Sequence, residues 1–298
     1  MTHNKCCRHG ASLRRKRCRR RKILRSIIFS CSIIAVAVFV AVGSSMIRSG
    51  DDRTNKYDVE AGNNTYDNAV IENSKISEKN KIQNNQSMLD DIMNSTQYPK
   101  QLKDLALKNE EALEFVYDYP AEHVKEHTID LTEEASMDSV PLFVQWDKRW
   151  GYEKYSGNFF AASGCGPTTL SMVVVYLTHN REASPIAVAK YSKEAGYSVD
   201  GSGSSWTLIS EGCMHYGVKA KAVALDESRM KAELDAGHPI VVNVGPGDFT
   251  DTGHFMVITG YDDEGFSIND PNSIEKSGKR WLFKNISSQI RAVWSMYV

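Results

Sequence analysis

The stretch that decides the fold is SGCGPTT at residues 163–169, which runs directly into the apolar segment LSMVVVYL at residues 170–177. Proline suits the first turn of a helix, because its missing N–H would have no partner there, so Pro167 predicts a helix that begins close to Cys165. Free N–H groups and the helix dipole favour a negative charge at that end of a helix. The position therefore favours the thiolate of Cys165, which is the nucleophilic form of cysteine.

A small buried residue is the alternative for any free cysteine. Cys165 fits that alternative poorly, because it lies between two glycines and ahead of the helix rather than on its apolar face. Cys213 shows the opposite pattern and shares a predicted helical face with Trp206, Ile209 and Tyr216. We therefore expect Cys165 to be a nucleophile and Cys213 to be a packing residue.

A nucleophilic cysteine needs a base, and His254 is the histidine best placed to provide one. It follows the small, polar loop GPGDFTDTG (245–253) and precedes the predicted strand FMVITGY (255–261). A residue at the mouth of a strand is held firmly while it stays open to a cleft. The other histidines outside the N-terminal tail lie in charged segments, in turns or late in a helix: His123, His127, His179, His215 and His238.

The predicted partner that orients His254 is Asp270, at the end of the next predicted strand, FSIND (266–270). If the turn at 262–265 pairs the two strands so that Ile258 faces Ile268, His254 and Asp270 project from the same side. A register shift of one residue would present Asn269 instead. We prefer Asp270, because it lies on the apolar face of its strand; an ordinary strand exit is the alternative.

Three motifs together resemble the C39-like cysteine peptidases of the papain-like superfamily: GCGPTTL around Cys165, GHFMVITGYD around His254 and INDP around Asp270. The segment QWDKRWG (145–151) resembles the lead-in to that domain, and the resemblance covers residues 140–298. It implies an α+β, papain-like fold, in which N-terminal helices carry the nucleophile at a helix start and pack on an antiparallel sheet. It also implies that Cys165 attacks a carbonyl carbon, His254 activates it and Asp270 orients the imidazole.

The resemblance implies an oxyanion site made of the Cys165 backbone N–H and a side-chain donor. A glutamine of the family usually lies a few residues before the cysteine, but here those positions are 160–164 and hold no glutamine. Gln145 lies further upstream, so Gln145 and Ser163 are both candidates. Backbone donors alone, with Gln145 as a surface amide, are the alternative.

Capping residues predict three more helices, ending at Gly196, Gly217 and Gly237. Their expected starts are Ser184, Ser204 or Ser205, and Asp226. Strands are predicted at 239–244, 255–261, 266–270, 280–283 and 292–297. Helices followed by antiparallel strands are typical of an α+β domain.

The N-terminal region combines a basic tail at 1–25 with an apolar segment at 26–47 that contains 22 uncharged residues. That length suits a transmembrane anchor, and the basic run RRKRCRRRK (14–22) predicts a cytoplasmic tail and an exported body. A signal segment cleaved near Gly43 is the alternative. Both interpretations place the domain outside the cell.

Two segments lead from this region to the domain. Residues 48–98 are rich in Asn, Ser, Lys and Asp, which predicts a disordered linker. Residues 99–139 form a predicted helical pre-domain segment, with an amphipathic helix that should end at Pro120. Docking onto the domain is the expected role of this segment, and inhibition of the cleft is the alternative.

Charge and cysteine placement exclude several classes of function. Residues 1–48 hold 12 of the 36 Lys and Arg residues and no acidic residue, so the remaining 24 bases and 37 acids give residues 49–298 a net charge of about −13. A region with this negative charge repels phosphate, which argues against nucleic acid as a partner. The sequence has no HExxH, calcium-loop or phosphate-loop motif, so we expect no metal and no cofactor. Cys165 and Cys213 alone do not make a disulfide framework.

The expected function is that of an extracytoplasmic thiol peptidase or amidohydrolase acting on amide bonds of peptides or cell-wall peptides. Acyl transfer by the same triad and a catalytically idle binding module are the two alternatives. The sequence gives no indication of the oligomeric state.

Overall fold

The structure, a computed structural model, describes residues 64–298, with side chains from Ser77 onward. Its contacts divide the chain into two units, 1–69 and 70–298, and the second unit contains nearly all of the described residues. The predicted basic tail and the apolar segment at 26–47 lie outside the described residues. From residue 64 onward, no helix has both the length and the apolar composition needed to cross a bilayer.

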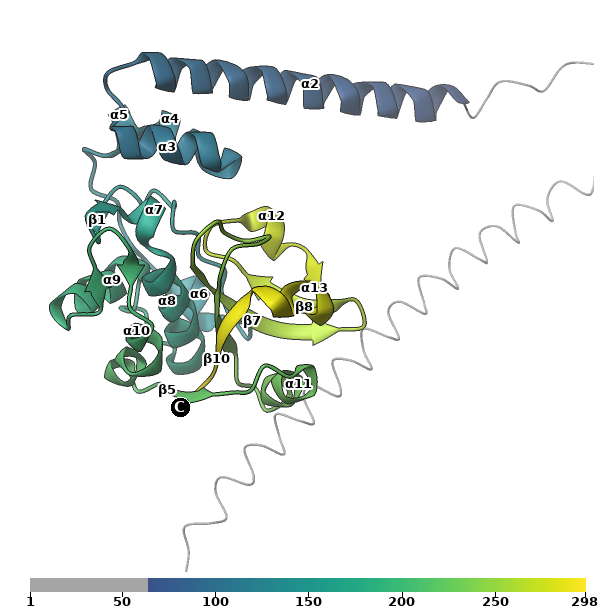
Figure 1. Ribbon diagram of the computed structural model, residues 1–298. Coiled ribbons are helices and arrows are strands. Elements are labelled where there is room, and N and C mark those ends of the chain that lie inside the picture. Colours follow the sequence, from purple (N-terminus) through teal and green to yellow (C-terminus); the bar gives the residue numbers. More distant parts are fainter. Residues whose placement is uncertain (1–63) are drawn as a thin grey trace, which may run out of the picture. The chain divides into compact units, whose positions relative to one another are not determined.

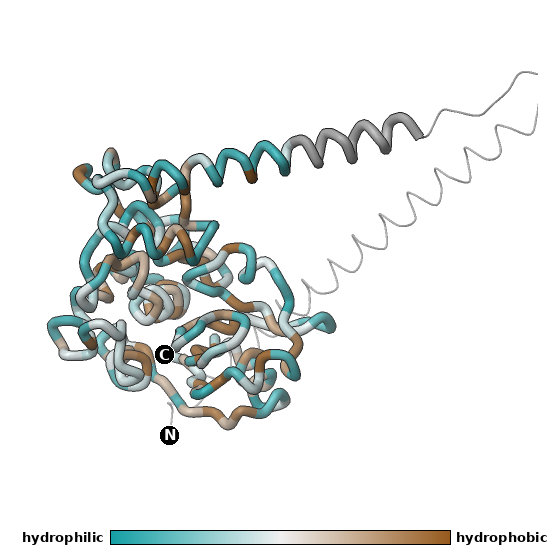
Figure 2. Tube along the Cα trace, turned by 45° about the horizontal axis from the view of Figure 1, so that its top comes forward, coloured by the Kyte–Doolittle hydropathy of each residue, from teal (hydrophilic) through white to brown (hydrophobic). Residues whose placement is uncertain are grey.

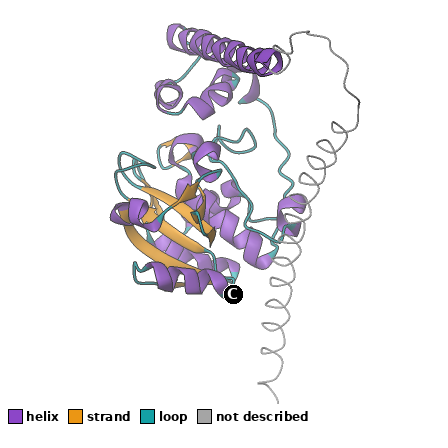
Figure 3. Cartoon of the chain, turned by 90° about the vertical axis from the view of Figure 1, so that its right-hand side faces the viewer, coloured by secondary structure: helices purple, strands orange, loops and turns teal. Residues whose placement is uncertain are grey.

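A six-stranded antiparallel sheet, in the order β5-β10-β6-β7-β8-β9, is the main sheet of the second unit (Figures 1 and 3). Its strands are β5 (Lys219–Ala222), β6 (Ile240–Val244), β7 (His254–Asp262), β8 (Gly265–Asn269), β9 (Arg280–Trp281) and β10 (Ile290–Tyr297). Five of the six overlap the predicted strands. The sequence KAKA of β5 gave no strand signal, and this edge strand is held by backbone pairing with β10.

Two short hairpins lie outside the main sheet. They consist of β1 (Lys154–Tyr155) with β2 (Asn158–Phe159), and of β3 (Ser198–Val199) with β4 (Gly203–Ser204). Glycines with positive φ at Gly157, Gly201 and Gly203 allow the tight turns of these hairpins.

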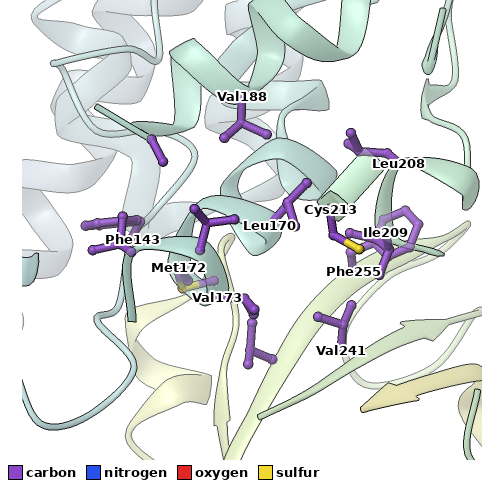
Figure 4. Packing of buried hydrophobic residues seen from close by; sticks show 14 of the residues in the cluster. Phe143, Leu170, Met172, Val173, Val188, Leu208, Ile209, Cys213, Val241 and Phe255 are labelled. Atoms are coloured by element: carbon purple, nitrogen blue, oxygen red, sulfur yellow. The ribbon is translucent and has the colours of Figure 1, made fainter. Parts of the chain in front are cut away.

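Apolar side chains pack on both faces of the main sheet. Phe255 and Val257 of β7 belong to the cluster that contains α8 (Cys165–Thr178) and α9 (Pro185–Glu194), part of which Figure 4 shows. Met256 and Ile258 belong to the opposite cluster, which contains α11 (Glu227–Asp235) and α13 (Phe283–Ile286). Alternate residues of one strand therefore serve two cores, which explains the nearly continuous apolar run in the strand sequence.

The predicted helix ends agree with the structure in most places. Ser184 caps α9 and Asp226 caps α11, each by accepting a backbone N–H. The predicted helix from Ser204 or Ser205 to Gly217 is instead broken into α10 (Thr207–Ser210) and the 3₁₀ helix η2 (Gly212–Tyr216). The break falls at Glu211, whose backbone angles (φ −128°, ψ −47°) are not helical, and the following Gly212 packs closely on the ring of Tyr197.

The prediction of a disordered linker at 48–98 is wrong for α2 (Asn64–Asn94). Figure 2 shows this helix as largely hydrophilic where its hydropathy is coloured, which is why its sequence gave no helical period. Its last turns bury Ile92 and pack Met88 and Leu89 against the segment that follows. This tertiary packing stabilises a helix that its own amphipathicity does not predict.

The predicted helix ending at Pro120 is also corrected. The chain forms α3 (Lys100–Lys108), the 3₁₀ helix η1 (Glu110–Ala112), α4 (Leu113–Tyr117) and α5 (Tyr119–Glu122). The break falls at Asn109, which has extended backbone angles and caps η1 with its side chain. Pro120 lies in the first turn of α5, where a proline is favourable, and does not end a helix.

Within the second unit, the pre-domain segment packs on the region that precedes Cys165 through an apolar cluster, here called the N-terminal cluster. Leu102 and Phe115 of the segment are buried in it together with Phe159 and Ala161, from the region just before Cys165. The remaining short helices are α6 (Thr132–Ser136), α7 (Phe160–Ser163), α12 (Ile274–Ser277) and η3 (Ser287–Gln289). The cluster thus connects the pre-domain segment to the part of the chain that carries the cysteine.

Candidate active site

Cys165 is the first residue of α8, directly after the N-cap Gly164, and is partly exposed. Both neighbouring glycines are needed for packing. A Cβ at Gly166 would lie 2.5 Å from the hydroxyl of Ser204, and a Cβ at Gly164 would lie 2.6 Å from the ring of Phe160. The two glycines therefore allow α8 to begin in close contact with its neighbours.

His254 and Asp270 form a buried pair. The Nε2 atom of His254 lies 2.7 Å from Oδ1 of Asp270, and the two residues are 6% and 0% exposed. Ile258 pairs with Ile268 across β7 and β8, which is the register on which the choice of Asp270 depended. Asn269 instead donates its side-chain amide to the carbonyls of residues 140 and 141. The structure thus places Asp270, and not Asn269, beside His254.

The electrostatics of Cys165 favour its thiolate. Burial alone would raise the pKa of the thiol, but the hydrogen bond and the charge of His254 outweigh it and hold the pKa below its ordinary value. Backbone N–H groups of Phe255 and Gly166 also stabilise the anion.

His254 is affected in the complementary direction. Burial opposes its protonation, yet the charge and hydrogen bond of Asp270, together with Cys165, raise the pKa of His254 to about 10. The three side chains therefore favour a thiolate–imidazolium pair at neutral pH.

Cys213 provides the contrast predicted from its helical face. It is completely buried in the apolar cluster of Figure 4, and burial raises the pKa of its thiol to about 11. At about pH 6, iodoacetamide is expected to label Cys165 at least about 10²-fold faster than Cys213, because the thiol pKa of Cys165 is lowered while that of Cys213 is raised, and only Cys165 is accessible. Peptide mapping by mass spectrometry measures the two rates, and labelling in urea is the control in which both cysteines react. Equal slow labelling of the folded protein would show that neither thiol is activated.

The two oxyanion candidates have different surroundings. Ser163 donates its only hydroxyl proton to the carbonyls of Tyr155 and Phe159, at 2.8 and 3.0 Å, so we correct its assignment as a side-chain donor. Gln145 is buried and lines the same cleft as Cys165 and His254. Its Nε2 atom donates one proton to the carbonyl of Ala161 at 2.7 Å, and a second proton remains on that nitrogen.

Two clefts meet at Cys165. The first, of about 770 Å³, is here called the Arg291 cleft and includes Cys165, Trp206, Asn243, Gly245 and Arg291. The second, of about 500 Å³, is called the Asp248 cleft and includes Cys165, Gln145, His254, Asp248 and Asp251. Gln101 of α3 lines both, so the pre-domain segment forms part of the wall beside the cysteine.

The other histidines of the described chain lie away from these clefts. His123 and His127 line a separate cleft of about 380 Å³ that does not include Cys165. His179 ends α8 in a left-handed conformation, His215 stacks on Tyr191, and His238 pairs with Glu233. His254 is thus the histidine that the described structure brings to Cys165.

Comparison with known proteins identifies the family. The model of the Peptidase_C39 like family matches residues 137–298, which is more than half of the chain. The chain belongs to this C39-like family. The predicted α+β fold, with the cysteine at a helix start packed on an antiparallel sheet, is confirmed. No curated protein is detectably similar to the chain.

The solved structures that are similar to the chain include two peptidase domains. The peptidase domain of Streptococcus ComA, a bifunctional ABC transporter involved in quorum sensing, is 19% identical, with a TM-score of 0.39; the match covers 53% of this chain and 96% of that one. A putative C39-like peptidase from Bacillus anthracis is 17% identical, with a TM-score of 0.34, and the match covers 53% of this chain and 95% of that one.

The C39-like region of this protein is held by residues that precede it. Asn109 donates its side-chain amide to the carbonyl of Asn272 at 2.9 Å, and Glu111 accepts the backbone N–H groups of Ile274 and Glu275 at 2.7 and 3.1 Å. These contacts fix the loop that follows Asp270. Sequence reasoning missed them, because no local pattern indicates that residues so far apart in the chain meet.

Proposed function

We propose that this protein is a cysteine peptidase or amidohydrolase that cleaves amide bonds in peptides or in the peptides of the cell envelope. The observation that carries the proposal is the buried His254, which is hydrogen-bonded to Asp270 and lines the same cleft as Cys165, whose thiol pKa it lowers. Membership of a peptidase family supports the same reaction class.

In the proposed reaction, the Cys165 thiolate attacks the carbonyl carbon of the scissile amide, and the oxyanion forms between the Cys165 backbone N–H and the second Nε2 proton of Gln145. The C–N bond then breaks while His254 gives its proton to the leaving amine. Water attacks the resulting thioester as His254 takes up one of its protons, and the acid leaves with the thiolate restored. Asp270 keeps the imidazole oriented and charged.

The position of His254 assigns a direction to the two clefts. The leaving amine must lie beside the group that protonates it, and His254 lines the Asp248 cleft. The Asp248 cleft therefore takes the leaving fragment, and the Arg291 cleft takes the acyl fragment that becomes attached to Cys165.

Product analysis tests the proposal. The full chain is incubated with a mixture of synthetic peptides and cell-wall peptide fragments, and new termini are identified by mass spectrometry, with and without an added amine. Free carboxylic acids as products support hydrolysis. Products joined to the amine support acyl transfer by the same three residues, and unchanged peptides across the whole mixture would count against the proposed function.

The rate of cleavage should depend on pH as a broad bell. The active pair needs Cys165 deprotonated and His254 protonated, so activity should rise at a pH below the ordinary thiol value of 9 and fall as the pH passes about 10. Initial rates on one peptide from about pH 4 to pH 11 measure both limbs. An upper limb near pH 6.5, the ordinary value for histidine, would contradict the proposed charge pairing.

We also propose that the domain works outside the cytoplasm. The support is the basic run at 14–22 followed by the uncharged segment at 26–47, which suits export by an anchor or by a cleaved signal.

A further inference from the structure

We propose that Arg291 forms a carboxylate-binding subsite, so that the preferred substrates carry an acidic residue on the acyl side of the cleaved bond. This inference rests on the proposed function, and in particular on the assignment of the Arg291 cleft to the acyl fragment.

The Arg291 cleft is nearly uncharged. Apart from the Cys165 thiolate, Arg291 is its only charged side chain among the residues that the structure describes, and the rest of the lining is dominated by glycine, serine and other small or neutral residues. The Asp248 cleft differs, because it mixes Asp104, Asp248 and Asp251 with two lysines. A substrate carboxylate in the Arg291 cleft would thus meet one arginine and no aspartate or glutamate.

The guanidinium of Arg291 is positioned by its surroundings. It lies flat over Gly245 at the end of β6, where a Cβ would be only 2.7 Å from its Nε atom. Its Nη1 atom donates to the carbonyl of Ser288 at 3.2 Å. A neutral carbonyl and a glycine hold the group, and the described residues offer it no carboxylate partner, so its charge is available to a ligand.

The same cleft also contains an apolar contact surface. Trp206 lines it and is 47% exposed, with its ring edge-to-face against Trp294 at 6.0 Å. Arginine can bind a carboxylate by two parallel hydrogen bonds, and an indole ring can pack on an aliphatic stem. Together these two groups suit the side chain of glutamate or aspartate. Residues 201–204 also line the cleft, and their small side chains leave backbone along which an extended peptide can lie.

The test compares peptide pairs that differ only by Glu or Gln at each of the first four positions on the acyl side. We expect one position at which Glu raises kcat/KM about tenfold over Gln, with the preference shrinking as salt is added. The Arg291→Glu variant should reverse the preference and favour Lys at that position. The matched control is Arg229→Glu, which reverses the charge at an exposed position on α11 that lines neither cleft. This variant should leave the preference for Glu over Gln unchanged.

A second variant separates the position of the guanidinium from its charge. Gly245→Ala keeps the cation but displaces it, so the Glu-to-Gln ratio should fall while cleavage of the Gln peptide changes less. Equal rates for Glu and Gln at all four positions would overturn the subsite and leave the proposed function intact. If no peptide is cleaved, binding to the Cys165→Ala protein, followed by tryptophan fluorescence, decides the question: tighter binding of a Glu peptide that Arg291→Glu abolishes supports the subsite, and equal affinities for Glu and Gln overturn it.

Discussion

Replacing Cys165 with serine is expected to lower the rate of peptide cleavage by about 10³-fold or more, because it removes the proposed nucleophile. The thermal unfolding midpoint should change by no more than about 2 °C, since the side chain lies at a helix start beside a cleft and is only partly buried at the edge of the apolar cluster. Cleavage of a fluorogenic peptide and differential scanning fluorimetry measure the two quantities on the same preparation.

The matched control is Cys213→Ser, which places a hydroxyl in the apolar cluster. This variant should keep its activity per folded molecule and lose about 1–3 kcal/mol of unfolding free energy. The Cys165 variant should therefore lose activity and keep its stability, whereas the Cys213 variant should lose stability and keep its activity. If Cys165→Ser unfolds the domain instead, Cys165 is a packing residue and the proposed mechanism fails.

Replacing Asp270 with asparagine is expected to lower the rate at about pH 8 by about 30-fold, which is the loss of imidazolium if the pKa of His254 falls from about 10 to its ordinary value of 6.5. Asparagine can still accept the hydrogen bond from His254 but carries no charge, and that charge raises the pKa of His254 to about 10. The alkaline limb of the pH–rate profile should therefore move from about 10 toward 6.5, so that less imidazolium remains at pH 8.

The neighbouring Asn269→Ala variant provides the comparison. Asn269 donates to two backbone carbonyls and does not contact His254 in the described structure, so its loss should weaken folding and leave the alkaline limb in place. A profile of Asp270→Asn that matches the wild type would show that Asp270 supplies structure and not charge.

The three proposed reactive residues could be predicted because each follows from a local rule. Pro167 marks the start of the helix at Cys165, and the polar loop before β7 marks His254 as a strand opening. Asp270 needed only the register of one hairpin, which the apolar faces of its two strands determine.

The features that the sequence did not predict depend on contacts between distant segments. The helical state of residues 64–94 depends on the burial of Ile92 by residues that follow it. Ser163 cannot donate to the oxyanion because its hydroxyl donates to the carbonyls of Tyr155 and Phe159, and no local sequence pattern predicts these contacts. The position of Gln145 depends on the hydrogen bond that its backbone N–H donates to the carbonyl of Pro271, and no spacing rule predicts that contact.

The contacts of Asn109 and Glu111 have a consequence for where the working enzyme begins. A fragment that begins at residue 137 would keep all three reactive side chains but would expose Phe159 and Ala161 to water. It would lose the hydrogen bonds from Asn109 and Glu111 to the loop that follows Asp270. It would also lose Gln101 from the cleft wall. The smallest self-sufficient unit therefore starts near residue 88, about fifty residues before the family boundary.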